Sequence, residues 1–403
     1  MLNKKDISLD GIRGLAALIV FLTHFLAAFK PNAVFGSAQS SELELFYKTP
    51  LGLITAGNFA VCLFFVLSGY VLSVKHFTHR TQDVDIYGDT LKRYVRLGIP
   101  LALTCFLSFL IYKGGFYYNH QVADLLANNW FRDYFNALND KNYFSFFREI
   151  LFQLFVKAHD YNPPAWTIGT ELLGSYLTFG ILVVARKAKI HYRFGLYLTL
   201  FLLLQGNHLQ NFILGLAIAD ARINYNHIEG KMAIVKNNRI LFYLTINCLF
   251  IFSLLLASFP YYVPQRILIS SSSFYNVFIF LDNRDIFGGG ITMISSFLFF
   301  VTYRYTIYKV WLETKLMQIL GQYSFMLYLT HFLSLCSVTS LVYLKTINKM
   351  SIFANLFLTF GMYVFSTILM TLLMAKIADF PAIRIGNQLK LFYLNSLDNQ
   401  KIP

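Results

Sequence analysis

Three ionisable side chains lie in an apolar run that is long enough to cross a bilayer, residues 9–29 (LDGIRGLAALIVFLTHFLAAF). They are Asp10, Arg13 and His24, and ionisable groups in lipid are costly and usually functional. On a helix, Arg13 and His24 share one face about 16 Å apart, and Asp10 lies one turn before Arg13, where it can pair with it. A neutral histidine can act as a general base or carry a transferred group. Alternatively, Asp10 and Arg13 are interface anchors and His24 is a hydrogen-bonded bundle histidine.

A second polar constellation begins at PPAWTIGTELLGSYLTFG, where Thr167, Glu171, Ser175 and Thr178 recur at helical spacing. This stripe should face the bundle or a wet cavity, because hydroxyls and a carboxylate facing lipid would be costly. Glu171 is the only acid of the stretch. It is either a structural partner for a cation or a group that raises the proton affinity of a nearby histidine such as His24.

Two further clusters carry candidate site residues. Lys92, Arg93 and Arg96 gather where a helix enters the membrane, and arginine binds phosphate through paired hydrogen bonds, although basic residues also anchor cytoplasmic helix ends. In a later apolar stretch, Tyr328 lies one turn before His331, so the two can share a face with Ser324. A packed core histidine is an equal alternative for His331.

Five of these stretches together resemble acyltransferase family 3, a family of membrane proteins. The matching motifs are LDGIRGLAAL with a histidine ten residues beyond the arginine, FFVLSGYVLS (64–73), LKRYVRLGIP (91–100), PAWTIGTELLGSY (164–176) and GQYSFMLYLTH (321–331). They are spread over nearly the whole chain, which makes the resemblance specific. A lone arginine and histidine at that spacing would be weak support.

The resemblance implies O-acylation, often acetylation, of a surface polysaccharide, a lipid-linked glycan or another exported molecule, with cytoplasmic acyl-CoA as donor and no bound cofactor or metal. It implies that His24, Glu171 and Arg13 are catalytic and that Arg93, Arg96 and Arg13 hold the donor phosphates. Asp10, Trp166, Tyr323, Ser324 and His331 would support the site. Residues 1–380 would form the transmembrane domain and 381–403 a short cytoplasmic tail, without the C-terminal extracytoplasmic domain of longer members.

The composition independently indicates an integral membrane protein of the all-α class. The chain is 56% hydrophobic, 18% aromatic and 13% charged, far from the values of soluble domains. The net charge of +14 is expected to mark cytoplasmic segments rather than a nucleic-acid partner. Cys62, Cys105, Cys248 and Cys336 lack the paired spacing of metal sites or disulfide frameworks, so they are interpreted as packing residues.

Apolar runs long enough to span lipid predict about ten helices. They are expected at 9–29, 57–76, 95–112, 165–185, 192–206, 207–222, 239–258, 286–303, 316–343 and 353–375. Most Lys and Arg outside these runs fall on one side if both termini are cytoplasmic, so we predict a multi-pass protein of the plasma or inner membrane with that orientation. The fifth and sixth spans are short and joined by a GNH turn.

Two external segments follow from this topology. Residues 113–163 are rich in aromatic side chains and contain FSFFREILFQLF, which is expected to form a short interfacial helix; these rings form either a sugar-stacking surface or an aromatic belt. Residues 259–285 read as a polar loop. A transporter or flippase of glycan or lipid intermediates is the competing class, but no repeated halves with paired broken helices are found in the sequence. A scaffold without catalysis would leave the pairing of Arg13 and His24 unexplained.

Overall fold

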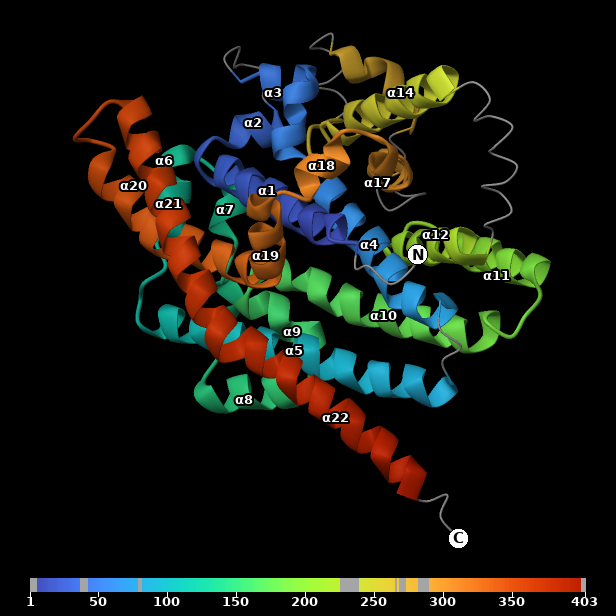
Figure 1. The fold of residues 1–403 in the computed structure, drawn as a ribbon. Coiled ribbons are helices and arrows are strands. Elements are labelled where there is room, and N and C mark those ends of the chain that lie inside the picture. The colour runs from blue at the N-terminus through green and yellow to red at the C-terminus, as the bar shows by residue number, and fades with distance from the viewer. Residues whose placement is uncertain are drawn as a thin grey trace.

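The computed structural model describes residues 6–36, 43–78, 82–224, 239–264, 267, 273–281 and 290–399. Helices and their connections make up these ranges, with no β-strand among them, so the predicted all-α class is confirmed. Within the same ranges, seven helical stretches are long and apolar enough to cross a membrane. Their helices are α1 Ser8–Phe29, α4 Gly57–Thr78, α5 Asp83–Lys113, α10 Trp166–Ala185, α14 Arg239–Ala257, α19 Lys315–Ser334 and α21 Ile352–Met374 (Figure 1).

The other three predicted spans correspond to shorter helices. These are α11 Ile190–Leu203, α12 Leu209–Asn224 and α17 Gly290–Thr302, of 14, 16 and 13 residues. A helix perpendicular to a bilayer needs about 20 apolar residues, so each of the three is short for a full crossing. The count of ten spans and the cytoplasmic position of both termini therefore stay predictions.

Helix α1 packs closely against α19, and the two helices run in the same direction. Asp10 lies beside Gly321 near their first turns, and His24 meets His331 farther along. The contact requires glycine, because a Cβ atom on Gly321 would lie 2.0 Å from the carbonyl oxygen of Asp10. This backbone contact fixes how the side chains of α1 and α19 face one another.

Helix α4 lies in the centre of the bundle, between α1, α10, α12 and α17. It is apolar on nearly every side, which is the pattern of a helix surrounded by protein or lipid. Ala60, Cys62, Leu63 and Val66 are completely buried along it. The helix thus forms a fixed wall onto which the polar residues of neighbouring helices are placed.

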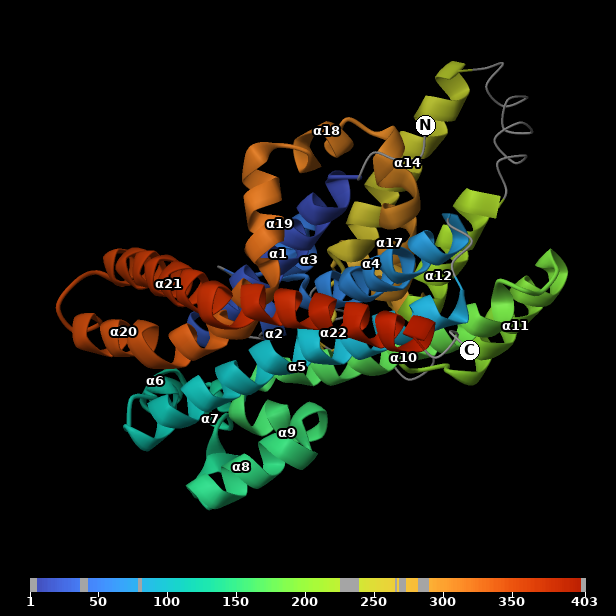
Figure 2. The ribbon, with the colours of Figure 1, turned by 60° about the horizontal axis from the view of Figure 1, so that its bottom comes forward.

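The chain continues past α21 into a long C-terminal helix. A π-helical segment, Ala375–Asp379, joins α21 to α22 Phe380–Asn399, which continues in the direction of α21 and lies beside α5 (Figure 2). Most of the tail predicted from residue 381 onward is therefore helical and packed on α5. Its position on the cytoplasmic side stays a prediction.

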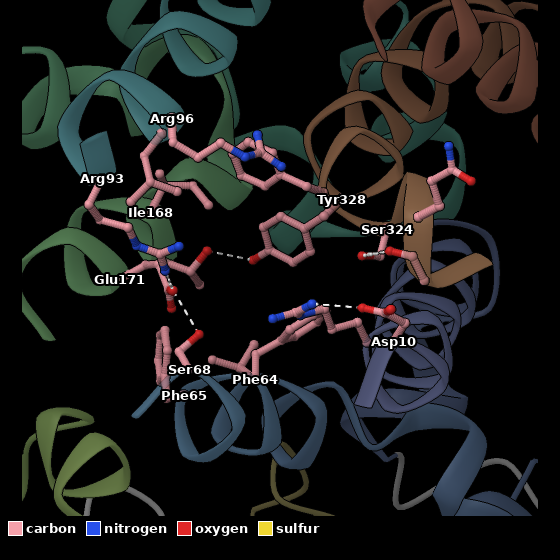
Figure 3. Close-up of a pocket in the computed structure, with 17 residues that line it drawn as sticks. Asp10, Phe64, Phe65, Ser68, Arg93, Arg96, Ile168, Glu171, Ser324 and Tyr328 are labelled. Carbon is pink, nitrogen blue, oxygen red and sulfur yellow. Dashed lines mark hydrogen bonds and ion pairs between the residues drawn. The ribbon is translucent and has the colours of Figure 1, made fainter. Parts of the chain in front are cut away.

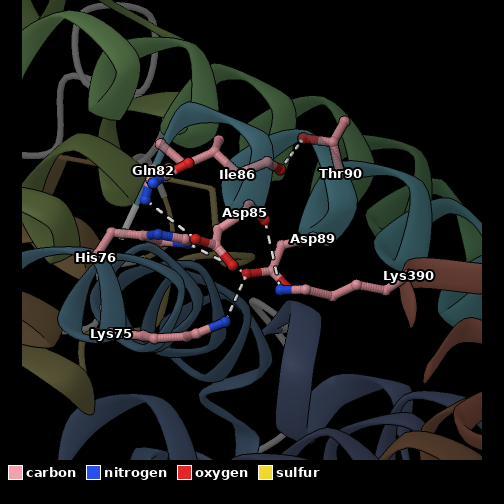
Figure 4. A network of polar contacts seen from close by, with 8 residues as sticks. All are labelled: Lys75, His76, Gln82, Asp85, Ile86, Asp89, Thr90 and Lys390. Carbon is pink, nitrogen blue, oxygen red and sulfur yellow. Dashed lines mark hydrogen bonds and ion pairs between the residues drawn. The ribbon is translucent and has the colours of Figure 1, made fainter. Parts of the chain in front are cut away.

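Asp89 joins three helices through its carboxylate (Figure 4). Lys75 of α4 donates a hydrogen bond to it at 3.1 Å, His76 Nε2 lies 3.3 Å away, and Lys390 of α22 donates from the other side. The Asp89 side chain is only 16% exposed, so solvent screens these contacts less than it screens surface ion pairs. The carboxylate thus holds α22 against α4 and α5.

We expect Asp89→Asn to lower the free energy of unfolding by about 1–3 kcal/mol, less than a fully buried ion pair would cost because the network is partly solvated. The change should appear as a lower thermal midpoint in detergent and as faster proteolysis of α22. Lys75→Gln is the matched control, since the Lys75 side chain is 48% exposed and should contribute less than about 1 kcal/mol. Equal stability of wild type and Asp89→Asn would contradict the clamping role.

Candidate active site

A cavity of about 340 Å³ opens between α1, α4, α5, α10 and α19 (Figure 3). This volume is within the usual range of small-molecule sites, about 300–1,000 Å³. Its lining combines aromatic and aliphatic side chains with five charged ones. The charged residues are Asp10, Arg13, Arg93, Arg96 and Glu171.

Each arginine of the cavity has an acidic partner. Arg13 Nη1 lies 2.9 Å from Asp10 Oδ1, which confirms the predicted pairing one turn apart. Arg93 is ion-paired with Glu171, and Arg96 with Asp379 of the segment before α22. Three cations and three anions therefore face one another, so an incoming phosphate must compete with these carboxylates for the arginines.

Glu171 is held by helices on both sides of the cavity. Ser68 of α4 donates a 2.7 Å hydrogen bond to its carboxylate, and Arg93 of α5 approaches the same oxygen. Arg93 also donates to Ser175 Oγ at 2.9 Å, one turn along α10. Thus Glu171 and Ser175 of the predicted polar stripe do face the bundle, as a seat for the Arg93 guanidinium.

A pair of histidines joins α1 to α19. His24 Nδ1 lies 2.8 Å from His331 Nε2, and the two rings are stacked with centroids 5.0 Å apart. His331 is fully buried, whereas His24 is partly exposed. The direct partner of His24 is therefore His331 of α19.

The hydrogen bonds of the pair assign the tautomers. His331 Nδ1 lies 3.2 Å from the carbonyl oxygen of Leu327, which can only accept, so this nitrogen carries a proton. In a neutral ring His331 Nε2 is then an acceptor, and His24 Nδ1 must donate to it. His24 Nε2 is left with its lone pair, and among the described residues it has no hydrogen-bond partner.

Tyr328 lies between the cavity and the histidines. It lines the cavity, and its ring centroid is 5.8 Å from that of His331. Thr167 of α10 donates a 2.9 Å hydrogen bond to the Tyr328 hydroxyl, and Phe64 of α4 packs edge-on at 6.2 Å. His24 is not among the residues that line the cavity, so this aromatic layer separates the two parts of the site.

Residues 6–375 match the acyltransferase domain that defines acyltransferase family 3. The chain belongs to this family. An acyltransferase of Cochliobolus lunatus, clz18, is 27% identical over 151 residues, a match that covers 28% of this chain and 31% of that protein. No solved structure matches the chain.

The structure does not pair Glu171 with His24, and of the two only Glu171 lines the cavity. Glu171 has Ser68 and Arg93 as partners, and His24 has His331. Helix α5 begins at Asp83 rather than near residue 95. Arg93 thus lies ten residues, about 15 Å, into α5, where it pairs with Glu171.

The remaining predicted residues lie at the edges of the site. Ser324 lines the cavity, but its hydroxyl donates to the carbonyl of Gly321 at 2.8 Å, a local helix contact. Tyr323 packs near Phe380 with ring centroids 6.2 Å apart, and Trp166 is 45% exposed beside His208; neither lines the cavity.

Sequence reasoning missed three residues that the site uses. Ser68 lies in the FFVLSGYVLS motif and was not singled out, although a serine within an apolar helix is a usable signal. Asp379 pairs with Arg96 across 283 positions, which no local spacing indicates. Trp130, stacked on His24 with centroids 5.9 Å apart, lies in an aromatic-rich segment where no single ring stood out.

We expect His331→Ala to lower kcat about 10²-fold while leaving KM for the donor within about twofold, because His331 orients His24 and contacts no cavity ligand. His331→Gln offers an amide oxygen to His24 Nδ1 and should recover part of the loss. Steady-state kinetics of both variants checks this. Wild-type turnover in His331→Ala would contradict the orienting role.

Proposed function

We propose that this acyltransferase moves an acyl group, in particular acetyl, from cytoplasmic acyl-CoA to a hydroxyl of a cell-surface glycan, a lipid-linked glycan or another exported acceptor at the plasma membrane. The proposal is carried by two features that lie next to each other. One is a cavity lined by three arginines, and the other is a histidine pair behind Tyr328. The first suits an anionic donor. The second suits proton or acyl transfer.

Donor binding is supported by the arginines. Arg13, Arg93 and Arg96 present planar guanidinium groups that match phosphate oxygens, and all three line the same cavity. Their carboxylate partners compensate the three cations around the cavity, which limits the cost of placing these charges in a membrane. A donor phosphate would replace Asp10 or Glu171 as the partner of an arginine, so binding exchanges one ion pair for another.

Acyl transfer requires a group that accepts a proton or the acyl group itself, and His24 Nε2 has the lone pair for either role. As a base, it would take the proton of the acceptor hydroxyl while that oxygen attacks the thioester carbonyl; the carbon–sulfur bond then breaks and the proton passes to the CoA thiolate. As a nucleophile, Nε2 would attack the thioester carbonyl and displace the CoA thiolate; the acceptor hydroxyl would then take the acyl group from Nε2, and its proton would pass to the thiolate. Either route needs Tyr328 to move so that the thioester can reach His24.

Mass spectrometry of surface glycans from cells with and without the gene tests this proposal. We expect a mass difference of one acyl group on a glycan or exported molecule, restored by the wild-type gene and not by His24→Ala. Identical glycan and exported-metabolite profiles in both strains would contradict it.

A further inference from the structure

Two short helices between α5 and α10 form a hairpin, α8 Tyr143–Phe152 and α9 Leu154–Tyr161, joined at Gln153. A helix in FSFFREILFQLF is thus confirmed, and a second helix follows it; its place in the membrane interface stays a prediction. Figure 2 shows the hairpin beside α5, away from α1. Its contacts along α5 define how deep it reaches.

The hairpin follows α5 from the first turn of α8 to the first residue of α9. The Tyr143 ring packs edge-on against Phe109, with centroids 5.3 Å apart. At the other end, a Cβ atom on Gly98 would lie 3.7 Å from Leu154 Cδ2. Helix α5 advances eleven residues between Gly98 and Phe109, which is roughly 16 Å. The tip of the hairpin therefore lies about half the thickness of a 30 Å hydrocarbon core below Phe109.

The second helix returns along the same surface. Cys105 Sγ lies 3.8 Å from the carbonyl oxygen of Ala158, and Ser108 donates to the carbonyl of Tyr161 near the starting level. The hairpin therefore enters and leaves on one side of the bundle. A helix lying flat in the membrane interface would not contact four successive turns of α5.

The tip also covers the seam between α5 and α10. The Phe155 ring contacts Tyr94 with centroids 5.3 Å apart, and a Cβ atom on Gly169 would lie 2.5 Å from the Phe155 carbonyl oxygen. Leu97 and Ile168, the neighbours of Gly98 and Gly169, line the cavity. Phe155 is thus on the outer side of the cavity wall, and glycine at 169 is what allows the close backbone approach.

Large apolar side chains cover the face that the hairpin turns away from the bundle. Phe144, Leu151 and Phe152 are 76%, 71% and 80% exposed, and Phe147 and Val156 are exposed beside them. Such a patch is unusual against water. Inside the hairpin, the buried Glu149 accepts hydrogen bonds from Lys141 and from Tyr161 at 2.9 Å, so its charge is compensated.

We propose that the α8–α9 hairpin is a re-entrant element whose apolar face contacts lipid acyl chains. The occupant is lipid because the hairpin lies alongside α5 and α10, two membrane-crossing candidates, within their apolar length. The exposed Arg148 on α8 has a stem long enough to extend towards the headgroups. The hairpin then seals the cavity laterally from the bilayer, and this assignment does not depend on the identity of donor or acceptor.

A spin label at Phe152→Cys tests the proposal in proteoliposomes. The Cys248→Ser background removes the exposed cysteine, and Cys62, Cys105 and Cys336 are buried. The matched control is Asp133→Cys in the exposed loop after α7 Asn129–Arg132. We expect the label at 152 to be relaxed by oxygen and to lose relaxation by nickel ethylenediaminediacetate, relative to position 133.

Two results would overturn the assignment. Equal nickel accessibility at both positions would place the face in water, and low accessibility of position 152 to both reagents would show that protein covers it. If Phe152→Cys does not insert, Leu151→Cys reports on the same face, since that side chain is also mostly exposed.

Discussion

Replacing His24 by alanine is expected to abolish acyl transfer, with kcat lowered at least about 10³-fold, while the protein remains inserted and folded. His24 Nε2 is the nitrogen left with a free lone pair once Leu327 and His331 have fixed the tautomers. Alanine removes that lone pair and leaves a small gap beside Trp130. The loss should therefore fall on turnover rather than on donor binding.

The measurement is acyl transfer from labelled donor in membranes, with size-exclusion profiles of both proteins to show that folding is retained. The exposed histidine His191 provides the matched control, and His191→Ala should keep wild-type turnover. Retained turnover in a well-expressed His24→Ala protein would remove His24 from the chemistry.

The second large effect is expected from the arginines. Arg93→Ala and Arg96→Ala should each raise KM for acyl-CoA about 10- to 100-fold, because each loses hydrogen bonds to a charged phosphate worth about 1.5–3 kcal/mol. Since neither group is next to His24, kcat should change far less. An unchanged KM with a collapsed kcat would contradict the phosphate-binding role.

The Arg93 variant needs a control for its ion pair, because Glu171 loses a partner with the arginine. An uncompensated carboxylate in the bundle would destabilise the protein regardless of donor binding. The double variant Arg93→Ala with Glu171→Gln removes both charges. It should recover stability while KM for the donor stays high, which separates the two effects.

Local spacing predicted the parts of the site that lie within one helix. The pairing of Asp10 with Arg13 depends only on one turn of α1, and the sequence places Tyr328 one turn before His331 on α19. Spacing within one helix does not predict contacts between residues of different helices. The bond between His24 and His331 depends on the close approach of α1 and α19 at Gly321, which hydropathy does not reveal.

The start of the third predicted span differs most clearly from the structure. Hydropathy placed the third span at 95–112, because the first turns of α5 carry charges, yet the helix begins at Asp83. In the structure, Arg93 is the ion-pair partner of Glu171. Charges that satisfy one another across helices can lie farther into a bundle than a hydropathy window allows.

Catalysis by His24 with an acyl-CoA donor can be followed through both products of the donor. Membrane vesicles from cells that express the wild-type chain or His24→Ala would receive acyl-CoA labelled in its acyl group, and free CoA and labelled acceptor would be quantified together. We predict equal amounts of CoA and acylated, non-protein product with the wild type, and neither above background with His24→Ala. Movement of a glycan or lipid across the membrane by the wild type without release of CoA would contradict the account and favour a transporter.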